Sequence, residues 1–372
     1  MKNTERATPY LLVIKMTDIK ALSAAMKKNR IKWGFVWAIL CAVFWGLGYV
    51  PLQLVWMVPP FAEGFSYFGA SEGMVVSAIL MSATQALVFT IVLFLLWTCV
   101  TGKFKDYVRT LVNFKVNKWF IVGCIFGGPM AILGSTLATG YIGAAFAASI
   151  GLLSTVVGAF LGWAINKEKF SKKAIIGIIM IFIGGIIILD PVSMMEEISN
   201  SSNGAILGYI GGILSAIGWG CEGNFAVRAL DVTDSDAGIT VRYTYETIIW
   251  FVVMFPVTIA FTGLDNFGDA FVSSFSSGNF IFWEFAAGLT LGLCYVMQYK
   301  AFPLVGVGRT LSIGSLYVPV SVVALFVFLG QVPSWMLVVG VILAVVGTFV
   351  MYWESDSLDE SMRDTGGAKD EA

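Results

Sequence analysis

The sequence predicts an all-α membrane protein with ten transmembrane helices, arranged as two inverted five-helix repeats with both termini in the cytoplasm. Three observations predict this fold: the amount and spacing of apolar sequence, a pattern that recurs in the second half of the chain, and the distribution of basic residues. Each of them reflects what a lipid bilayer demands of a polypeptide, because backbone polar groups in hydrocarbon must be paired within the protein.

Apolar residues dominate the chain. Of its 372 residues 58% are hydrophobic and 13% are charged, and the mean hydropathy is +0.83. A helix needs about 20 apolar residues to cross the hydrocarbon core. The candidate spans are roughly 33–55, 74–100, 118–138, 141–165, 172–190, 204–227, 237–261, 280–301, 309–330 and 334–353. They occupy most of the sequence and leave no room for a soluble catalytic domain.

Two patterns recur along the chain at a fixed distance. The first set returns 174 positions later and comprises Gly34, Ile39, Leu40, Ala42, Trp45 and Gly46, matched by Gly208, Ile213, Leu214, Ala216, Trp219 and Gly220. The second returns 163 positions later and comprises Ser149-Ile150-Gly151, Gly177 and Gly184, matched by Ser312-Ile313-Gly314, Gly340 and Gly347. Because each half holds an odd number of spans, the second copy must enter the membrane from the opposite face. Such inverted repeats expose one central site to either side in turn and are typical of transporters.

The basic residues give the orientation. All 23 Lys and Arg lie before the first span, around the even-numbered connections or in the C-terminal tail, and the odd-numbered connections carry only acids. The positive-inside rule therefore predicts that both termini lie in the cytoplasm. The expected location is the inner (plasma) membrane of the cell. The predicted organisation is a basic cytoplasmic segment at 1–32, a first repeat at 33–190, an outer linker at 191–203, a second repeat at 204–353 and an acidic cytoplasmic tail at 354–372. Translation could begin at Met1 or at Met26.

Several absences narrow the function. The chain has no histidine, so it has no imidazole proton relay and no histidine metal site. It also lacks a phosphate-binding G-x-x-x-x-G-K-[ST] loop and any pairing of nucleophile and base. We therefore expect no enzymatic activity, no cofactor, no metal and no nucleic-acid partner. The expected partners are the lipid bilayer and a small molecule, with the choice between monomer and homodimer left open.

Aromatic and acidic residues near the middle of several spans predict a site for a cation. A quaternary ammonium group is bound by aromatic faces, often beside a carboxylate. A carboxylate deep in a membrane is costly and usually faces a cavity, a partner or a pathway. The candidate substrate-binding residues are Trp45, Tyr49, Trp219, Glu222, Glu246, Tyr295, Gln298 and Tyr317. Two longer outer connections, 56–73 and 262–279, are rich in Phe, Gly and Ser and are expected to cap this site.

The acids have a second interpretation, which the sequence leaves open. Glu222 could form a structural ion pair with Arg228 or Arg242 instead of facing substrate. Glu246 stands four residues after Arg242 and could neutralise it across one helical turn. Three further charged residues lie close to predicted helix ends and are expected to reach water: Glu284, Lys300 and Arg309.

The pattern resembles the drug/metabolite transporter superfamily over residues 31–353. The clearest marks are the junction from Gly162 to Gly184 and its repeat from Gln331 to Gly347. The segments that look like the bacterial choline importers of this superfamily are Phe44-Trp45-Gly46-Leu47-Gly48, Gly128-Pro129, Tyr141-Ile142-Gly143 and Trp219-Gly220-Cys221-Glu222, with Arg242, Tyr295, Tyr299 and Tyr317 at matching places. The chain departs from those importers at Ser154-Thr155 and at Tyr243, Tyr245 and Glu246.

The resemblance implies a secondary transporter that takes up choline or a related quaternary ammonium compound. In this interpretation Trp45, Trp219, Tyr295 and Tyr317 surround the ammonium, and Glu222 offsets its charge. The alternatives are an exporter of amino acids or drugs from the same superfamily and, from another class, a non-transporting membrane scaffold or sensor.

Overall fold

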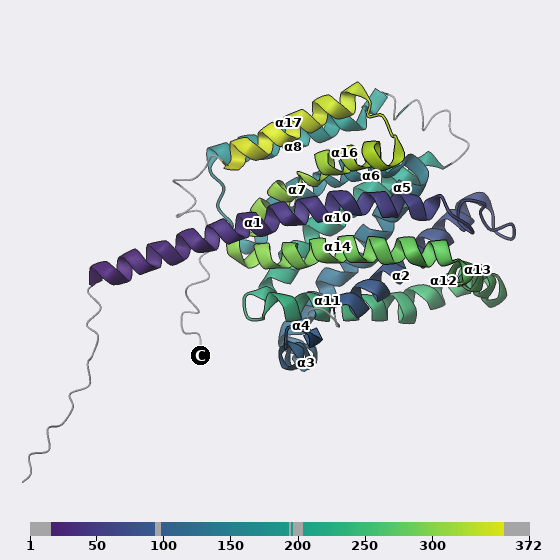
Figure 1. Cartoon of the computed structure of the whole chain (residues 1–372), viewed down its shortest axis with the longest axis horizontal. Helices are drawn as coiled ribbons and strands as arrows, with labels where there is room; N and C mark the ends of the chain where they lie inside the picture. Colours follow the sequence, from purple (N-terminus) through teal and green to yellow (C-terminus); the bar gives the residue numbers. More distant parts are fainter. Residues whose placement is uncertain (1–15, 94–97, 193–194, 196–203, 353–372) are drawn as a thin grey trace, which may run out of the picture.

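The computed structural model describes residues 16–93, 98–192, 195 and 204–352 (Figure 1). Every regular element in these ranges is a helix. The elements are α1 (Met16–Trp56), α2 (Ala70–Leu93), α3 (Phe104–Val112), α4 (Phe114–Ile125), η2 (Phe126–Ile132), α5 (Leu133–Ile142), α6 (Ala144–Gly151), α7 (Leu153–Asn166), α8 (Lys172–Leu189), α10 (Ala205–Leu230), α11 (Ser235–Ile249), η3 (Trp250–Met254), α12 (Phe255–Thr262), α13 (Leu264–Ser276), α14 (Gly278–Val305), α15 (Val307–Gly314), α16 (Tyr317–Leu329) and α17 (Trp335–Tyr352).

Nine helical segments within the described ranges are long and apolar enough to cross a membrane. They are Lys28–Trp56, Ala70–Leu93, Phe114–Ile142, Ala144–Asn166, Lys172–Leu189, Ala205–Leu230, Ser235–Thr262, Gly278–Val305 and Val307–Leu329. The last predicted span corresponds to α17, whose apolar stretch Trp335–Met351 is shorter. The chain is therefore all-helical and has the long apolar helices of a multi-pass membrane protein, as the composition predicts.

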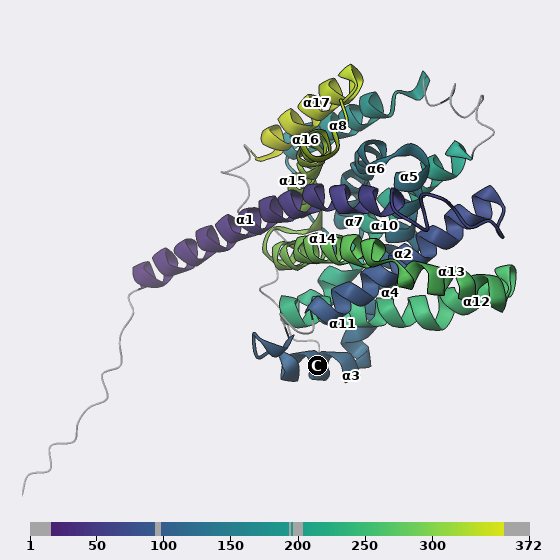
Figure 2. The ribbon, with the colours of Figure 1, turned by 45° about the vertical axis from the view of Figure 1, so that its right-hand side comes forward.

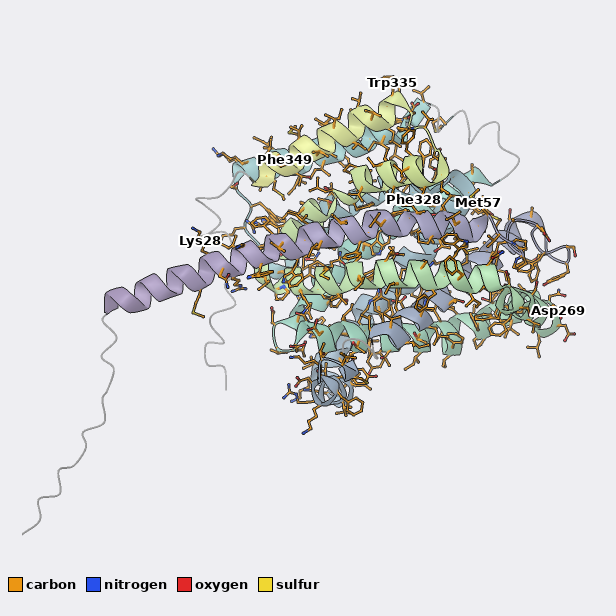
Figure 3. All side chains as sticks on the ribbon, in the orientation of Figure 1. Lys28, Met57, Asp269, Phe328, Trp335 and Phe349 are labelled. Atoms are coloured by element: carbon orange, nitrogen blue, oxygen red, sulfur yellow. The ribbon has the colours of Figure 1, made fainter. Side chains whose placement is uncertain are left out.

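The first long helix begins before the first predicted span. Helix α1 begins at Met16 and continues without a break to Trp56, so residues 16–32 of the predicted basic segment are helical and continuous with that span. Figure 3 labels Lys28 where α1 leaves the bundle, and the helix extends well beyond it. The predictions for the first 15 residues, for most of the 191–203 linker and for the C-terminal tail lie outside the described residues.

Glycines set the closest helix contacts. Gly34 of α1 lies against Val305 of α14 and Gly48 lies against Leu291, so the two helices run antiparallel and side by side (Figures 1 and 2). A Cβ atom at Gly34 would overlap Val305 Cγ1, and one at Gly48 would overlap Leu291 Cδ2, so either substitution would force the side chain on α14 to move. Membrane helices use small residues in this way because they let neighbouring backbones approach closely.

Helices α8 and α17 form a second closely packed pair, visible along one edge of the bundle (Figures 1 and 2). A Cβ atom added at Gly177 would lie 2.5 Å from the carbonyl oxygen of Gly347, and one added at Gly184 would lie 2.6 Å from that of Gly340. The same holds for a substitution on the other helix, because a Cβ added at Gly347 would lie 2.7 Å from the carbonyl oxygen of Gly177. The two backbones therefore touch along this seam.

Two long helical segments are each interrupted by a glycine with a positive φ angle. Gly143 separates α5 from α6 with φ +83°, and Gly306 separates α14 from α15 with φ +86°. Only glycine adopts this region of backbone space without strain. A third irregularity is the π-helical segment η2, which contains Pro129; proline has no N–H to donate and so breaks the regular α-helical ladder.

One end of the bundle is closed by an aromatic cluster that we call the lid. Its members come from the connection after α1, from α12 and α13, and from the start of α14: Trp56, Phe61, Phe65, Phe255, Phe267 and Phe280. The rings of Phe61 and Phe280 lie 5.0 Å apart, and Ser277 Oγ donates a 2.7 Å hydrogen bond to the Pro59 carbonyl. Met57 and Asp269 mark this end in Figure 3. The two connections that were expected to form a cap therefore pack together.

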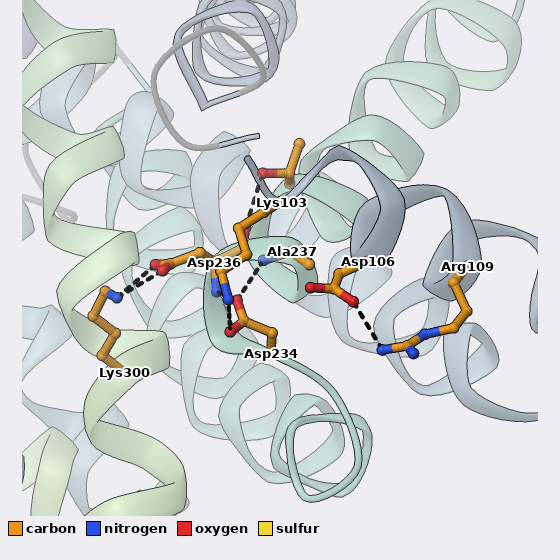
Figure 4. Close-up of polar contacts among 8 residues, drawn as sticks. Lys103, Asp106, Arg109, Asp234, Asp236, Ala237 and Lys300 are labelled. Atoms are coloured by element: carbon orange, nitrogen blue, oxygen red, sulfur yellow. Dashed lines mark hydrogen bonds and ion pairs between the residues drawn. The ribbon is translucent and has the colours of Figure 1, made fainter. Parts of the chain in front are cut away.

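Ion pairs join elements at the opposite end (Figure 4). Lys103 Nζ lies 2.7 Å from Asp234, and Lys300 Nζ lies 2.7 Å from Asp236. Asp234 also caps α11, because its Oδ1 accepts hydrogen bonds from the backbone N–H groups of Asp236 and Ala237. Lys300, expected to reach water near a helix end, is 23% exposed and has a carboxylate partner on α11.

We predict that Asp234→Ala lowers thermal stability by about 1 kcal/mol, the usual value of a helix N-cap. Partial burial works to raise the pKa of Asp234, but Lys103 and the N–H groups at the start of α11 outweigh burial and hold that pKa below its ordinary value. The contribution is therefore fully present above the ordinary aspartate pKa and is lost as the pH falls through the lowered folded-state pKa.

The measurement is thermal unfolding of the purified protein in detergent at neutral and acidic pH. Asp106→Ala is the matched control, because Asp106 pairs with the exposed Arg109. Equal losses for the two variants, or a loss for Asp234→Ala that does not shrink in acid, would contradict the prediction.

Candidate functional site

Five of the predicted site residues form one aromatic group, which we call the aromatic cage: Trp45, Tyr49, Trp219, Tyr295 and Tyr317. The ring of Trp45 stacks on that of Tyr317 at 4.2 Å and meets that of Trp219 edge-on at 4.9 Å. Trp219 Nε1 donates a 2.7 Å hydrogen bond to the hydroxyl of Tyr295. The cage thus joins residues of α1, α10, α14 and α16 that are far apart in the sequence.

Four cage members line a small cavity between the helices. Trp45, Tyr49, Trp219 and Tyr295 line it, whereas Tyr317 lies behind them and donates its hydroxyl hydrogen to the Ala148 carbonyl. The remaining lining residues are Leu52, Gln85, Phe89, Ile132, Ser135, Thr136 and Leu291. The cavity measures about 20 Å³, which is room for about one water molecule. The site is therefore closed around its aromatic faces in this conformation.

The two predicted acids do not line this cavity. Both pair with Arg242, whose Nε lies 2.7 Å from Glu222 and whose Nη1 contacts Glu246. Tyr299 donates a 3.1 Å hydrogen bond to Glu222, and Trp250 Nε1 lies 3.4 Å from Glu246. We call Glu222, Arg242 and Glu246 the ion cluster. In the structure Glu222 and Glu246 both pair with Arg242. This arrangement is the second interpretation that the sequence left open.

The ion cluster is completely enclosed by its neighbours. The exposed fractions of Glu222, Arg242 and Glu246 are 2%, 0% and 0%. The π-helical turn η2 makes room for it, because a Cβ at Gly128 would lie 2.7 Å from Glu246 Cδ and one at Gly127 would overlap Arg242 and Glu222. Only glycine fits at either position while the ion cluster is present.

Tyr295 connects the ion cluster with the aromatic cage. The guanidinium carbon of Arg242 lies 5.1 Å from the ring centroid of Tyr295 and 4.0 Å from that of Tyr243. The same Tyr295 accepts the hydrogen bond from Trp219 and lines the cavity. A charge placed in the cavity therefore lies one aromatic ring away from the ion cluster.

Sequence reasoning missed some polar groups and misplaced others. Gln85, Ser135 and Thr136 line the cavity, whereas the predicted Gln298 is buried on α14 without lining it. A lone glutamine in the middle of the apolar α2 was the signal that could have identified Gln85. The polar end of the site is thus built from α2 and α5.

Two charged residues are buried where water was expected. Arg309 is 2% exposed and donates to the Lys169 carbonyl, and Glu284 is 0% exposed. Both expectations are wrong because helix α14 and its continuation α15 are covered on several sides by neighbouring helices, so a position near a helix end need not reach solvent. Within the described residues no group of three metal-ligating side chains occurs.

Comparison with known proteins shows the fold alone. No family model matches the sequence, and no curated protein matches it. One of 25 matching solved chains, described only as "Crystal structure of protein", has a TM-score of 0.55 and 15% sequence identity and covers 89% of this chain and 99% of its own. The helical arrangement therefore has an experimentally determined counterpart, and the site must be interpreted from its own residues.

We predict that Arg242→Gln destabilises the protein by about 3–5 kcal/mol, because it leaves two buried carboxylates without a counter-charge. Glu222→Gln should cost less, since Arg242 keeps Glu246 and the cluster becomes neutral. Thermal and denaturant unfolding in detergent would measure both, with Arg109→Gln as an exposed-pair control expected to cost under about 1 kcal/mol. An Arg242→Gln variant as stable as the control would disprove a structural role for the ion cluster.

Proposed function

We propose that this chain is a secondary transporter whose ten spans form two inverted repeats with both termini in the cytoplasm, and that it takes up choline or a related quaternary ammonium compound. The observation that carries the proposal is a small aromatic cavity beside a buried cluster of two carboxylates and one guanidinium. Symmetry, aromatic geometry and charge each support one part of it.

The contacts between helices follow the symmetry that an inverted repeat requires. Under the 163-residue relation Gly177 corresponds to Gly340, and Gly184 corresponds to Gly347. The contact between Gly177 and Gly347 therefore maps onto the contact between Gly340 and Gly184, and both occur. A pair of contacts that exchange in this way is what a two-fold axis between the repeats would produce.

A second pair of contacts obeys the same rule. Gly34 lies against Val305, and the corresponding residue Gly208 lies against Ile142, which stands 163 positions before Val305. Trp45 and Trp219, also related by the repeat, contact each other directly. A residue that touches its own equivalent lies beside the axis, so the aromatic cavity lies where the two halves meet, as in transporters with inverted repeats.

The cage suits a cation that has no proton to donate. Quaternary ammonium groups are held by the negative faces of several aromatic rings, with Trp the strongest. Trp45, Tyr49, Trp219 and Tyr295 offer four such side chains around one cavity. The hydroxyls of Ser135 and Thr136 and the amide of Gln85 would bind a polar group at the far end of the substrate, such as an alcohol.

The ion cluster favours a positive substrate without touching it. With both carboxylates ionised, its two negative charges and one positive charge leave a net charge of −1 behind Tyr295. This arrangement replaces the direct pairing of Glu222 with substrate that the sequence predicted. An inside-negative membrane potential adds about 2.3 kcal/mol per 100 mV toward cation entry.

We predict that Trp219→Leu weakens choline binding about 2- to 30-fold, because one cation–π contact contributes about 0.5–2 kcal/mol. Isothermal titration or a radioligand assay on purified protein would measure the change. Trp163→Leu is the matched control, since Trp163 is 60% exposed on the outside of the bundle and should leave affinity unchanged. Equal affinities for the two variants would remove the cage from the substrate site.

The proposal as a whole is tested by thermal shift with a panel of cations and zwitterions, followed by uptake of labelled choline into proteoliposomes. Stabilisation and uptake by choline-like compounds alone would support it. Stabilisation by amino acids or drugs with efflux would replace it by the exporter alternative. Binding without any flux across the membrane would favour a sensor or scaffold.

A further inference from the structure

Glu284 is a buried carboxylate to which the proposed site gives no role. It lies on α14, its side chain is 0% exposed, and among the described residues neither of its carboxylate oxygens has a hydrogen-bond partner. Gln85 of α2 is a polar side chain close enough to act on it. Within the same part of the chain Gln85 Nε2 also has no partner, and Gln85 lines the aromatic cavity. One amide therefore lies between this carboxyl group and the proposed substrate site.

The surroundings of Glu284 differ from those of the other buried acids. Glu222 and Glu246 share the guanidinium of Arg242, whereas no ion pair involves Glu284 among the described residues. A buried carboxylate without a counter-charge costs so much free energy that burial favours its protonated form. The burial of Glu284 without an ion pair therefore favours a neutral carboxylic acid in this conformation.

No charged group on the neighbouring helices changes this conclusion. The helices that contact α14 carry charged and titratable groups, among them Tyr49 on α1, Glu72 on α2, Arg242 and Glu246 on α11, Asp265 and Asp269 on α13, Glu222 on α10 and Arg309 on α15, and α14 itself carries Cys294, Tyr295 and Tyr299. Burial and the amide of Gln85 are what act on Glu284. Glu72, Asp265 and Asp269 are exposed to solvent.

A lid residue lies one helical turn from Glu284 on α14. Phe280 stands one turn before it on α14, is fully buried and packs against Phe61 of the connection after α1. Ser277, at the start of the same helix, is bonded to the Pro59 carbonyl. Separation of the lid from α14 would give water access to the carboxyl group, and return of the lid would exclude it.

We propose that Glu284 is a proton-binding residue of the transport cycle, which takes up one proton when the lid end of the bundle closes and releases it when that end opens. The proton comes from water and forms a neutral carboxylic acid, whose O–H can be donated to the amide oxygen of Gln85. Closing over a charged Glu284 would bury an unpaired carboxylate, so alkaline conditions oppose closure. This inference rests on the proposed function, because it adds a coupling step to the same central site.

Infrared spectroscopy tests proton binding without any transport assay. Wild-type protein near neutral pH should show the carbonyl stretching band of a buried carboxylic acid, and Glu284→Gln should lose that band while keeping its thermal stability. Glu72→Gln, which alters an exposed acid on α2, should retain it. A spectrum unchanged by Glu284→Gln would overturn the proposal.

Exchange of labelled choline across proteoliposomes tests the role in the cycle. Wild-type exchange should fall as pH rises, by up to about tenfold per pH unit for one titrating group. Glu284→Gln should exchange at a rate that no longer depends on pH, whereas Glu72→Gln should follow the wild type. A pH profile that survives in Glu284→Gln would overturn the coupling role. Failure of the wild type to exchange choline at any pH would overturn the proposed function, and the infrared comparison would still decide whether Glu284 binds the proton.

Discussion

A single guanidinium held between two carboxylates at the centre of the bundle is the interaction on which the site depends. Arg242 binds Glu222 of α10 and Glu246 of its own helix, and Tyr299 of α14 completes the set. Each charge would be prohibitively costly alone in so dry a place, and each is tolerated because the others are present. The glycines of η2 and the packing of three helices are consequences of accommodating this cluster.

Under the proposed function, the residues that touch the substrate are different from those that carry charge. The aromatic cage would contact an ammonium group through its ring faces, and the ion cluster would act on it from one ring further away. A substrate then need not compete with Arg242 for a carboxylate, and its release is not opposed by a direct ion pair. Charge complementarity at this distance selects the sign of the ligand more than it adds affinity.

Hydropathy was enough to predict the helical class, and the position of each aromatic residue near the middle of its span was enough to predict the aromatic cage. Each of these features can be found from the sequence of one helix at a time. Pairing across helices could not be predicted in the same way. Gln85 and Gln298 are both single glutamines in apolar spans. Gln298 shares a face of α14 with the cavity-lining Leu291 and Tyr295, but it lies about one turn further along the helix and does not line the cavity. Glu284 was expected in water because the lid is formed by connections whose packing has no periodic signal.

The two ends of the bundle are closed by different forces. The lid is an assembly of aromatic rings, whereas the opposite end is joined by Lys103 with Asp234 and Lys300 with Asp236. Dissolved salt screens partly exposed ion pairs but does not weaken apolar packing. Ionic strength should therefore loosen one end of the molecule and not the other, so the salt concentration on either side of the membrane becomes a variable that biases which end opens first.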